Sequence, residues 1–110
     1  MELNWTAARK YCQVIGRDLV SFANEEEMSK ARAVINNDGN WWIGFTDERQ
    51  EGNWVWSDGR SVTWTSWHSC CPRVKRNKNC AYLYANDGEW YDDPCSYEYN
   101  KFICRMSSGW

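Results

Sequence analysis

The segment from His68 to Cys71 concentrates the most reactive side chains of the sequence. It holds the single histidine of the chain, followed by Cys70 and the directly adjacent Cys71. Imidazole and thiolate groups bind zinc, so His68, Cys70 and Cys71 are candidate zinc ligands. The two cysteines can also pair with each other, pair with a second chain, form an additional loop disulfide or stay as free thiols. We rank a vicinal or interchain disulfide above the zinc site.

Catalysis by these groups is not expected. A cysteine beside a histidine can act as a nucleophile, but no residue pattern supplies a group to orient His68 or an oxyanion hole. Asp92 and Asp93 are neighbouring acids of a kind that is common in turns. The sequence therefore predicts a protein that is not an enzyme.

A cluster of basic residues follows the reactive segment. It consists of Arg73, Lys75, Arg76 and Lys78. No acidic residue falls between His68 and Tyr84, although the whole chain has a formal net charge of -2. Arginine binds carboxylate, sulfate and phosphate through its planar fork, and Trp67, Tyr82 and Tyr84 are placed to add stacking or cation–π contacts. The cluster predicts either an anion-binding loop or an ordinary solvated basic loop.

Composition limits which classes of binding partner and which cellular location are expected for this protein. The basic segment is short and the rest of the chain is acidic, which argues against nucleic acid. No stretch approaches the about 18 apolar residues of a membrane helix, so no membrane insertion is expected. The six cysteines form an even set without C-x-x-C spacing, which indicates disulfides of an oxidising compartment, with fifteen pairings open. The sequence predicts a secreted protein or an extracellular domain of a surface protein.

The elements that must position these residues make one α+β domain over residues 1–110. Apolar residues at helical spacing predict a helix over residues 5–15, ended by Gly16, and a second helix capped by Asn24 with Glu27 in a capping box. Most of the nine tryptophans are expected in the core. Strands are predicted at 41–45, 54–56, 80–85, 89–91 and 101–105, and residues 65–79 form a long loop. Two helices followed by short strands indicate an α+β fold.

Several short motifs, in order along nearly the whole chain, resemble the C-type lectin-like domain. They are Leu3–Cys12, Leu19-Val20-Ser21, Trp42-Ile43-Gly44-Phe45, Gly52–Gly59, Trp90-x-Asp92-x-x-Cys95 and Phe102-Ile103-Cys104. Each motif alone is weakly specific, whereas the ordered series is specific. The resemblance implies a C-type lectin-like fold with two helices, short antiparallel sheets and a long loop. It also implies that Cys12 pairs with Cys104 and that Cys80 pairs with Cys95.

The same resemblance implies that the calcium-and-sugar site of the family is dismantled. In the calcium-dependent members, the long loop supplies Glu-Pro-Asn or Gln-Pro-Asp after a tryptophan, and then an acid just before a cysteine. Here Cys71-Pro72-Arg73 follows Trp67, and Lys78 stands at the position of the later acid. The proline of this motif is cis in the family, and Pro72 is expected to be cis as often as trans.

The predicted strand at 89–91 and the residues after it correspond to the remaining calcium ligands of the family. The family places Asn and Asp after the tryptophan of this strand, and here Tyr91 replaces the Asn while Asp92 remains. Calcium requires a cage of several oxygen ligands, and arginine and lysine have no acceptor to offer. We therefore expect no calcium at this site and no other cofactor.

The residues of the long loop and the late strands are the candidates for ligand binding. They are Trp67, Arg73, Lys75, Arg76, Lys78, Tyr82, Tyr84, Tyr91 and Asp92. One hypothesis is calcium-independent binding of acidic glycans or microbial surface ligands, as innate-immune pattern recognition. The alternative is a protein-binding receptor domain of the natural-killer-receptor type that binds no sugar.

One edge of the domain is expected to be open. Family members usually carry a strand before the first helix, and Met1-Glu2-Leu3 matches the residues just before that helix, so we expect this strand to be absent. The final strand at 101–105 would then expose unpaired backbone groups along one side. This predicts a homodimer through that strand, or its cover by the tail at 107–110.

Overall fold

Both predicted helices are present in the computed structural model, which describes residues 2–73 and 77–105. The first helix, α1, spans Trp5–Val14, and its N-cap Asn4 accepts a hydrogen bond from the backbone N–H of Ala7 at 2.8 Å. Its buried residues Trp5, Ala8 and Cys12 recur at helical spacing, so they form one face against the sheet. Gly16 then adopts a φ of 80°, a left-handed conformation that ends the helix.

The second helix, α2, spans Glu25–Val34. Asn24 accepts from the backbone N–H of Glu27 at 2.9 Å, as the capping-box pattern predicts. The Glu27 carboxylate reaches back to the backbone N–H of Ala23 rather than to that of Asn24, and it also pairs with Arg60. These two partners outweigh the effect of burial and lower the pKa of Glu27. The N-terminus of α2 is therefore joined to the segment after the second strand.

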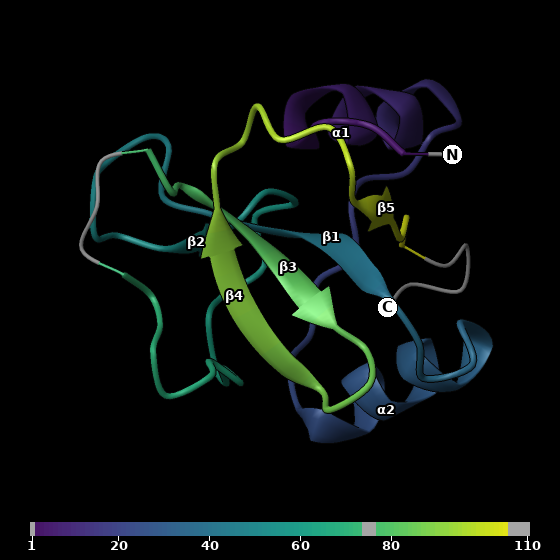
Figure 1. Ribbon diagram of the computed structural model, residues 1–110. Coiled ribbons are helices and arrows are strands. Elements are labelled where there is room, and N and C mark those ends of the chain that lie inside the picture. Colours follow the sequence, from purple (N-terminus) through teal and green to yellow (C-terminus); the bar gives the residue numbers. More distant parts are fainter. Residues whose placement is uncertain (1, 74–76, 106–110) are drawn as a thin grey trace.

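Five strands form one sheet between the two helices (Figure 1). They are β1 (Asn40–Thr46), β2 (Val55–Trp56), β3 (Cys80–Tyr84), β4 (Glu89–Asp93) and β5 (Lys101–Phe102). The order is β2-β1-β3-β4 with antiparallel pairing, and β5 pairs in parallel with β1. The Leu19-Val20-Ser21 motif forms no strand of this sheet and contributes an isolated bridge between Leu19 and Cys104. Among the described residues, no helix is long and apolar enough to cross a membrane.

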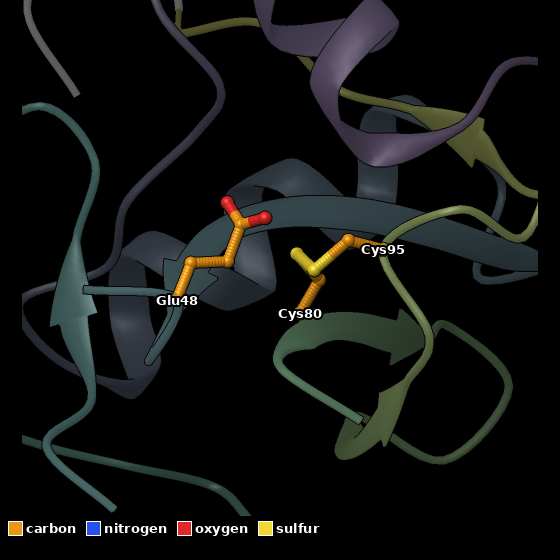
Figure 2. Close-up of side chains that lie close together, drawn as sticks. All are labelled: Glu48, Cys80 and Cys95. Atoms are coloured by element: carbon orange, nitrogen blue, oxygen red, sulfur yellow. A yellow bond between two sulfur atoms is a disulfide. The ribbon is translucent and has the colours of Figure 1, made fainter. Parts of the chain in front are cut away.

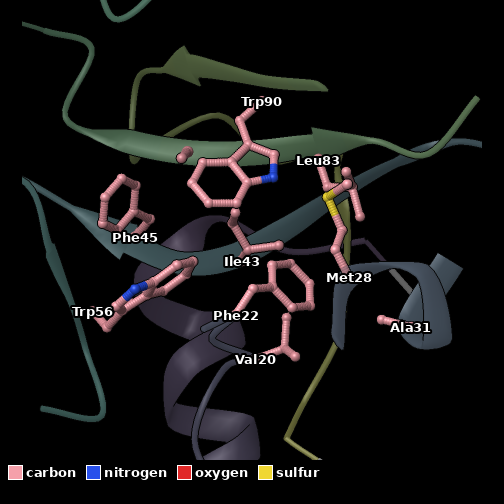
Figure 3. Packing of buried hydrophobic residues seen from close by; sticks show 10 residues of the cluster. Val20, Phe22, Met28, Ala31, Ile43, Phe45, Trp56, Leu83 and Trp90 are labelled. Atoms are coloured by element: carbon pink, nitrogen blue, oxygen red, sulfur yellow. The ribbon is translucent and has the colours of Figure 1, made fainter. Parts of the chain in front are cut away.

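The core is built largely from aromatic rings. Trp90 is fully buried at its centre, where Phe45, Trp56 and Phe22 surround it with ring centroids 5.3–6.2 Å away (Figure 3). Trp67, expected as a ligand-binding residue, packs on the same cluster, 4.8 Å from Trp54 and 5.8 Å from Phe45. Its ring therefore anchors the start of the long loop in the core, and less of the ring surface is left to contact a ligand.

Disulfides connect the remaining parts of the fold. Cys12 pairs with Cys104, and Cys80 pairs with Cys95, the two pairings that the family resemblance implies. The first ties α1 to the chain after β5, and the second closes the base of the segment that contains β3 and β4. Disulfides that close long stretches of chain typically stabilise a fold by about 2–4 kcal/mol each.

The expected open edge of the final strand is largely covered. The backbone N–H of Leu3 donates to the carbonyl of Asn100 at 3.2 Å, and that of Val20 donates to the carbonyl of Ile103 at 2.9 Å. The N–H of Arg105 donates to the carbonyl of Asp18 at 2.8 Å. Backbone groups of residues 100, 103 and 105 are therefore hydrogen-bonded to Leu3 and to the segment at 18–20, and a homodimer through 101–105 stays an untested prediction. The tail at 107–110 lies outside the described residues.

Candidate functional site

The one carboxylate that survives from the family's calcium ligands is bound by an arginine. Asp92 lies on the inward-facing side of β4, with no exposed surface. The backbone N–H of Arg73 donates to Asp92 Oδ2 at 2.8 Å, and Arg73 Nε donates to Oδ1 at 2.9 Å. A terminal nitrogen of the same guanidinium donates to the backbone carbonyl of Asp92. Both carboxylate oxygens and the carbonyl oxygen thus have partners from one residue.

The long loop carries its own cation beside Asp92, the guanidinium of Arg73. Arg73 stands where the family's motif has Asn, and the Cys71–Pro72 peptide before it is cis, as in the family. The guanidinium supplies the positive charge that the buried carboxylate requires. Arg73 was expected to offer its fork to an anionic ligand. Its fork points inward instead, although 36% of the side chain stays exposed.

Lys78 also lies near an acid rather than in an all-positive patch. The pKa of Asp93, on the outer face of β4, is raised by burial, while the nearby charges of Lys78 and Arg73 act in the opposite direction. The other two basic candidates, Lys75 and Arg76, lie outside the described residues. Among the described residues, the two basic candidates Arg73 and Lys78 thus lie beside the acids Asp92 and Asp93, and an anion site in this loop stays a prediction.

Four rings form an aromatic row on the outer face of the β3–β4 hairpin: His68, Tyr82, Tyr84 and Tyr91. Tyr82 and Tyr91 are cross-strand partners and stack with centroids 5.4 Å apart. His68 stacks on Tyr91 at 4.8 Å, and Tyr84 meets Tyr91 edge-on at 6.3 Å. His68 reaches this position because its backbone N–H donates to the carbonyl of Trp90 at 3.0 Å. The row therefore joins the long loop to the sheet.

The environment of the aromatic row favours neutral phenols. Burial, together with the charge of Asp93, raises the pKa of Tyr82 to about 12. Burial also raises the pKa of Tyr91, and the nearby acids Asp87 and Glu89 add to that effect. The phenols of Tyr82 and Tyr91 are thus held in the neutral form, with acidic neighbours on the same hairpin.

Alkaline unfolding tests the environment of Tyr82. Its pKa of about 12 in the folded protein lies above the value of about 10 for an exposed phenol. The stabilisation that this difference provides is complete below pH of about 10 and is lost as the pH rises toward the folded value. Urea unfolding over this pH range should show a steeper loss of stability in wild type than in Tyr82→Phe. Tyr99→Phe, at a ring that is 70% exposed, should keep the wild-type dependence. Equal slopes in wild type and Tyr82→Phe would contradict the assignment.

The two adjacent cysteines form a disulfide with each other. They close a tight turn in which the N–H of Cys71 donates to the carbonyl of His68 at 2.8 Å, and the N–H of Cys70 donates to His68 Nδ1 at 3.2 Å. Neither sulfur is a thiolate in this state. The alternatives of a zinc site at His68, Cys70 and Cys71, a nucleophile and an interchain bridge are therefore not formed here.

A second group of potential metal ligands also contains two cysteines that are joined in a disulfide. Glu48 lies beside Cys80 and Cys95, with one ligand atom of each residue within 4.8 Å of the others (Figure 2). Because both sulfurs belong to the Cys80–Cys95 disulfide, only the carboxylate could bind a metal ion. Burial raises the pKa of Glu48, and Arg9 opposes that effect.

Sequence reasoning missed a groove on another part of the molecule. It has a volume of about 620 Å³ and is lined by the start of α1, the loop at 46–53 and the segment at 55–60. This volume falls in the range of small-ligand sites. Two of its arginines are already engaged, Arg9 with Asp18 and Arg60 with Glu27. Because the start of α1 and the stretch from 46 to 60, which are distant in the chain, form it together, no local sequence pattern signals the groove.

Comparisons with known proteins agree on the family. The family described as "Lectin C-type domain" matches residues 1–106. A "C-type lectin mannose-binding isoform" of Oxyuranus scutellatus is 36% identical over 111 residues, which cover 93% of this chain and 70% of that protein. An "Alpha-N-acetylgalactosamine-specific lectin" of Patiria pectinifera is 37% identical over 73 residues, covering 64% of this chain and 43% of that protein.

Solved structures give the same result. Human lithostathine superposes with a TM-score of 0.84 at 30% identity, covering 94% of this chain and 83% of that chain. A calcium-independent type II antifreeze protein superposes with a TM-score of 0.86 at 28% identity, covering 94% of this chain and 78% of that chain. With the family match spanning nearly the whole sequence and the fold shared in full, the chain belongs to the C-type lectin domain family.

Proposed function

We propose that this domain recognises glycans without calcium, as an extracellular pattern-recognition module for microbial or other cell surfaces. The observation that carries the proposal is the bond between Arg73 and the buried Asp92. The family consists of carbohydrate-binding modules without catalytic activity, so the domain is not an enzyme. Three disulfides support an extracellular location.

The class of ligand is supported by the relatives. Their names describe binding of mannose in one case and of N-acetylgalactosamine in another. Tyr91 of the aromatic row directly precedes Asp92 on β4, the strand that carries ligand-binding residues in the family, and its ring lies on the outer face of that strand. It offers ring surface and phenol hydroxyls, groups that bind the apolar faces and the hydroxyl groups of sugars. Tyr84, at 36% exposure, is its most accessible described tyrosine.

Independence from calcium is supported by charge and by fold. A calcium ion at Asp92 would have to displace a guanidinium that makes two hydrogen bonds to this residue, beside a third from the Arg73 backbone N–H. The ion would regain few oxygen ligands, because Tyr91 and Lys78 stand at two further ligand positions of the family. The similar fold of a calcium-independent antifreeze protein is consistent with a loop that keeps its form without the ion.

A glycan array with and without a calcium chelator tests the proposal. We expect the same set of glycans to bind in both conditions. Tyr84→Ala should weaken that binding about tenfold, the usual loss for one good aromatic contact. Tyr99→Ala, on a more exposed ring outside the aromatic row, is the matched control and should bind like wild type.

Two results would refute the proposal. Binding that disappears in chelator would show that calcium is needed after all. A blank array, together with binding to a cell-surface protein, would favour the receptor alternative of the natural-killer type. Acidic glycans on the same array also test whether Lys75 and Arg76 attract anions, because such binding should weaken as salt is added.

A further inference from the structure

The three disulfides of the domain differ in what they do for the fold. Cys12–Cys104 and Cys80–Cys95 join residues 92 and 15 positions apart, whereas Cys70–Cys71 joins neighbours. A cross-link stabilises a fold mainly by shortening the loops that the unfolded chain can form, and the effect grows with the length of the loop. Adjacent residues close no such loop. Folding therefore favours the oxidised form of the first two disulfides far more than that of the third.

Access to the sulfur atoms separates the disulfides in the same way. Cys70 is exposed and Cys71 is half-buried, whereas Cys12 and Cys80 have no exposed surface. Thiol–disulfide exchange requires an attacking thiolate to reach a sulfur atom. A reductant can therefore approach Cys70 in the folded protein, but one sulfur of each of the other two disulfides is enclosed.

The position of this disulfide connects it to the candidate site. The turn that it closes begins at His68, whose ring stacks on Tyr91. Two residues after Cys71, across the cis bond to Pro72, lies Arg73 with its bonds to Asp92. Trp67 fixes the chain before the turn in the core. Opening the disulfide would thus change the segment between two fixed points, Trp67 and Arg73.

We propose that Cys70–Cys71 is a thiol-exchange site, opened by dithiol reductants while the other two disulfides persist, and that its opening loosens the turn between His68 and Arg73. One thiolate of the reductant attacks one of the two sulfurs and forms a mixed disulfide, and the other protein sulfur leaves as a thiolate. The second thiolate of the reductant then attacks the reductant sulfur of the mixed disulfide and releases the remaining protein sulfur as a thiolate. The reductant leaves as a cyclic disulfide after losing two electrons, and the two protein thiolates take protons from water.

Differential alkylation of the native protein tests this proposal. The folded domain is equilibrated with increasing dithiothreitol, and exposed thiols are then blocked with iodoacetamide and located by peptide mass spectrometry. Cys70 and Cys71 should be alkylated together, at a reductant concentration at least about tenfold below that needed for the other four cysteines. Simultaneous alkylation of all six cysteines, or earlier alkylation of Cys80 and Cys95, would overturn the proposal.

Amide hydrogen exchange tests the consequence for the loop. In reduced wild type, exchange should quicken at the backbone N–H groups of Cys70 and Cys71, which are hydrogen-bonded to His68 in the oxidised protein. The variant Cys70→Ser/Cys71→Ser should match the reduced protein before any reductant is added, and its unfolding midpoint should stay near that of wild type.

Unchanged exchange in both reduced wild type and the variant would show that the disulfide does not hold the turn. A large fall of the unfolding midpoint in the variant would show that the pair stabilises the whole fold, contrary to the proposal. These measurements involve no glycan, so they are independent of the proposed lectin function.

Discussion

Replacing Arg73 with methionine is expected to lower the free energy of unfolding by about 3 kcal/mol. The change keeps most of the apolar stem but leaves the carboxylate of Asp92, which has no exposed surface, without its cation and its hydrogen bonds. Removing one partner of a buried ion pair costs about 3–5 kcal/mol. We expect the lower end of that range, because 36% of the Arg73 side chain is exposed and water can partly replace it.

A double-mutant cycle separates this pairing from other effects of the substitution. Asp92→Asn alone leaves a partly exposed guanidinium, so it should cost less than Arg73→Met. The double variant should cost less than the sum of the two single variants, because it contains no uncompensated buried charge. Urea unfolding at neutral pH supplies all four free energies.

The exposed ion pair between Lys30 and Glu26 is the matched control. Its side chains are 58% and 80% exposed and lie one helical turn apart, an arrangement worth about 0.3–0.5 kcal/mol. Lys30→Met should therefore change stability only slightly. If Arg73→Met costs no more than Lys30→Met, or if the cycle is additive, the bond to Asp92 does not hold the loop.

Local sequence patterns accounted for the helices and most of the sheet. Asn24 and Glu27 predicted the start of α2 because capping depends on neighbouring residues only. The strand predicted at 80–85 is present as β3, where Ala81 and Leu83 are buried while Tyr82 and Tyr84 lie on the outer face. Features that depend only on neighbouring residues, such as a helix cap or the alternation of a strand, can be predicted from the sequence.

The arrangement of the site depends on contacts between distant residues, which local patterns do not contain. The sequence shows Arg73 among basic neighbours, where arginine is usually solvated. Only the fold brings it to Asp92, 19 positions away in the chain. Tryptophan is a residue type that is common at binding sites, but Trp67 packs against Trp54 and Phe45 and so contributes to the core. The cover of the final strand by Leu3 and Val20 likewise required the three-dimensional structure.

Calcium binding should be absent from this domain if Arg73 has taken the place of the ion. Sites in extracellular modules bind calcium with dissociation constants of about 10⁻⁴–10⁻³ M. A ligand that binds the folded state raises its stability in proportion to the logarithm of its concentration. Wild type should therefore unfold at the same temperature in calcium as in chelator, since its single remaining carboxylate at the family site is occupied by a guanidinium.

Calorimetric titration of calcium into the oxidised wild-type domain, with Asp92→Asn as the control, tests this account most directly. The titration should extend to about 10 mM, above the range of extracellular calcium sites. We predict that both proteins give only the heat of dilution. A saturable heat in wild type that disappears in Asp92→Asn would show that Asp92 still holds calcium, and that Arg73 does not replace it.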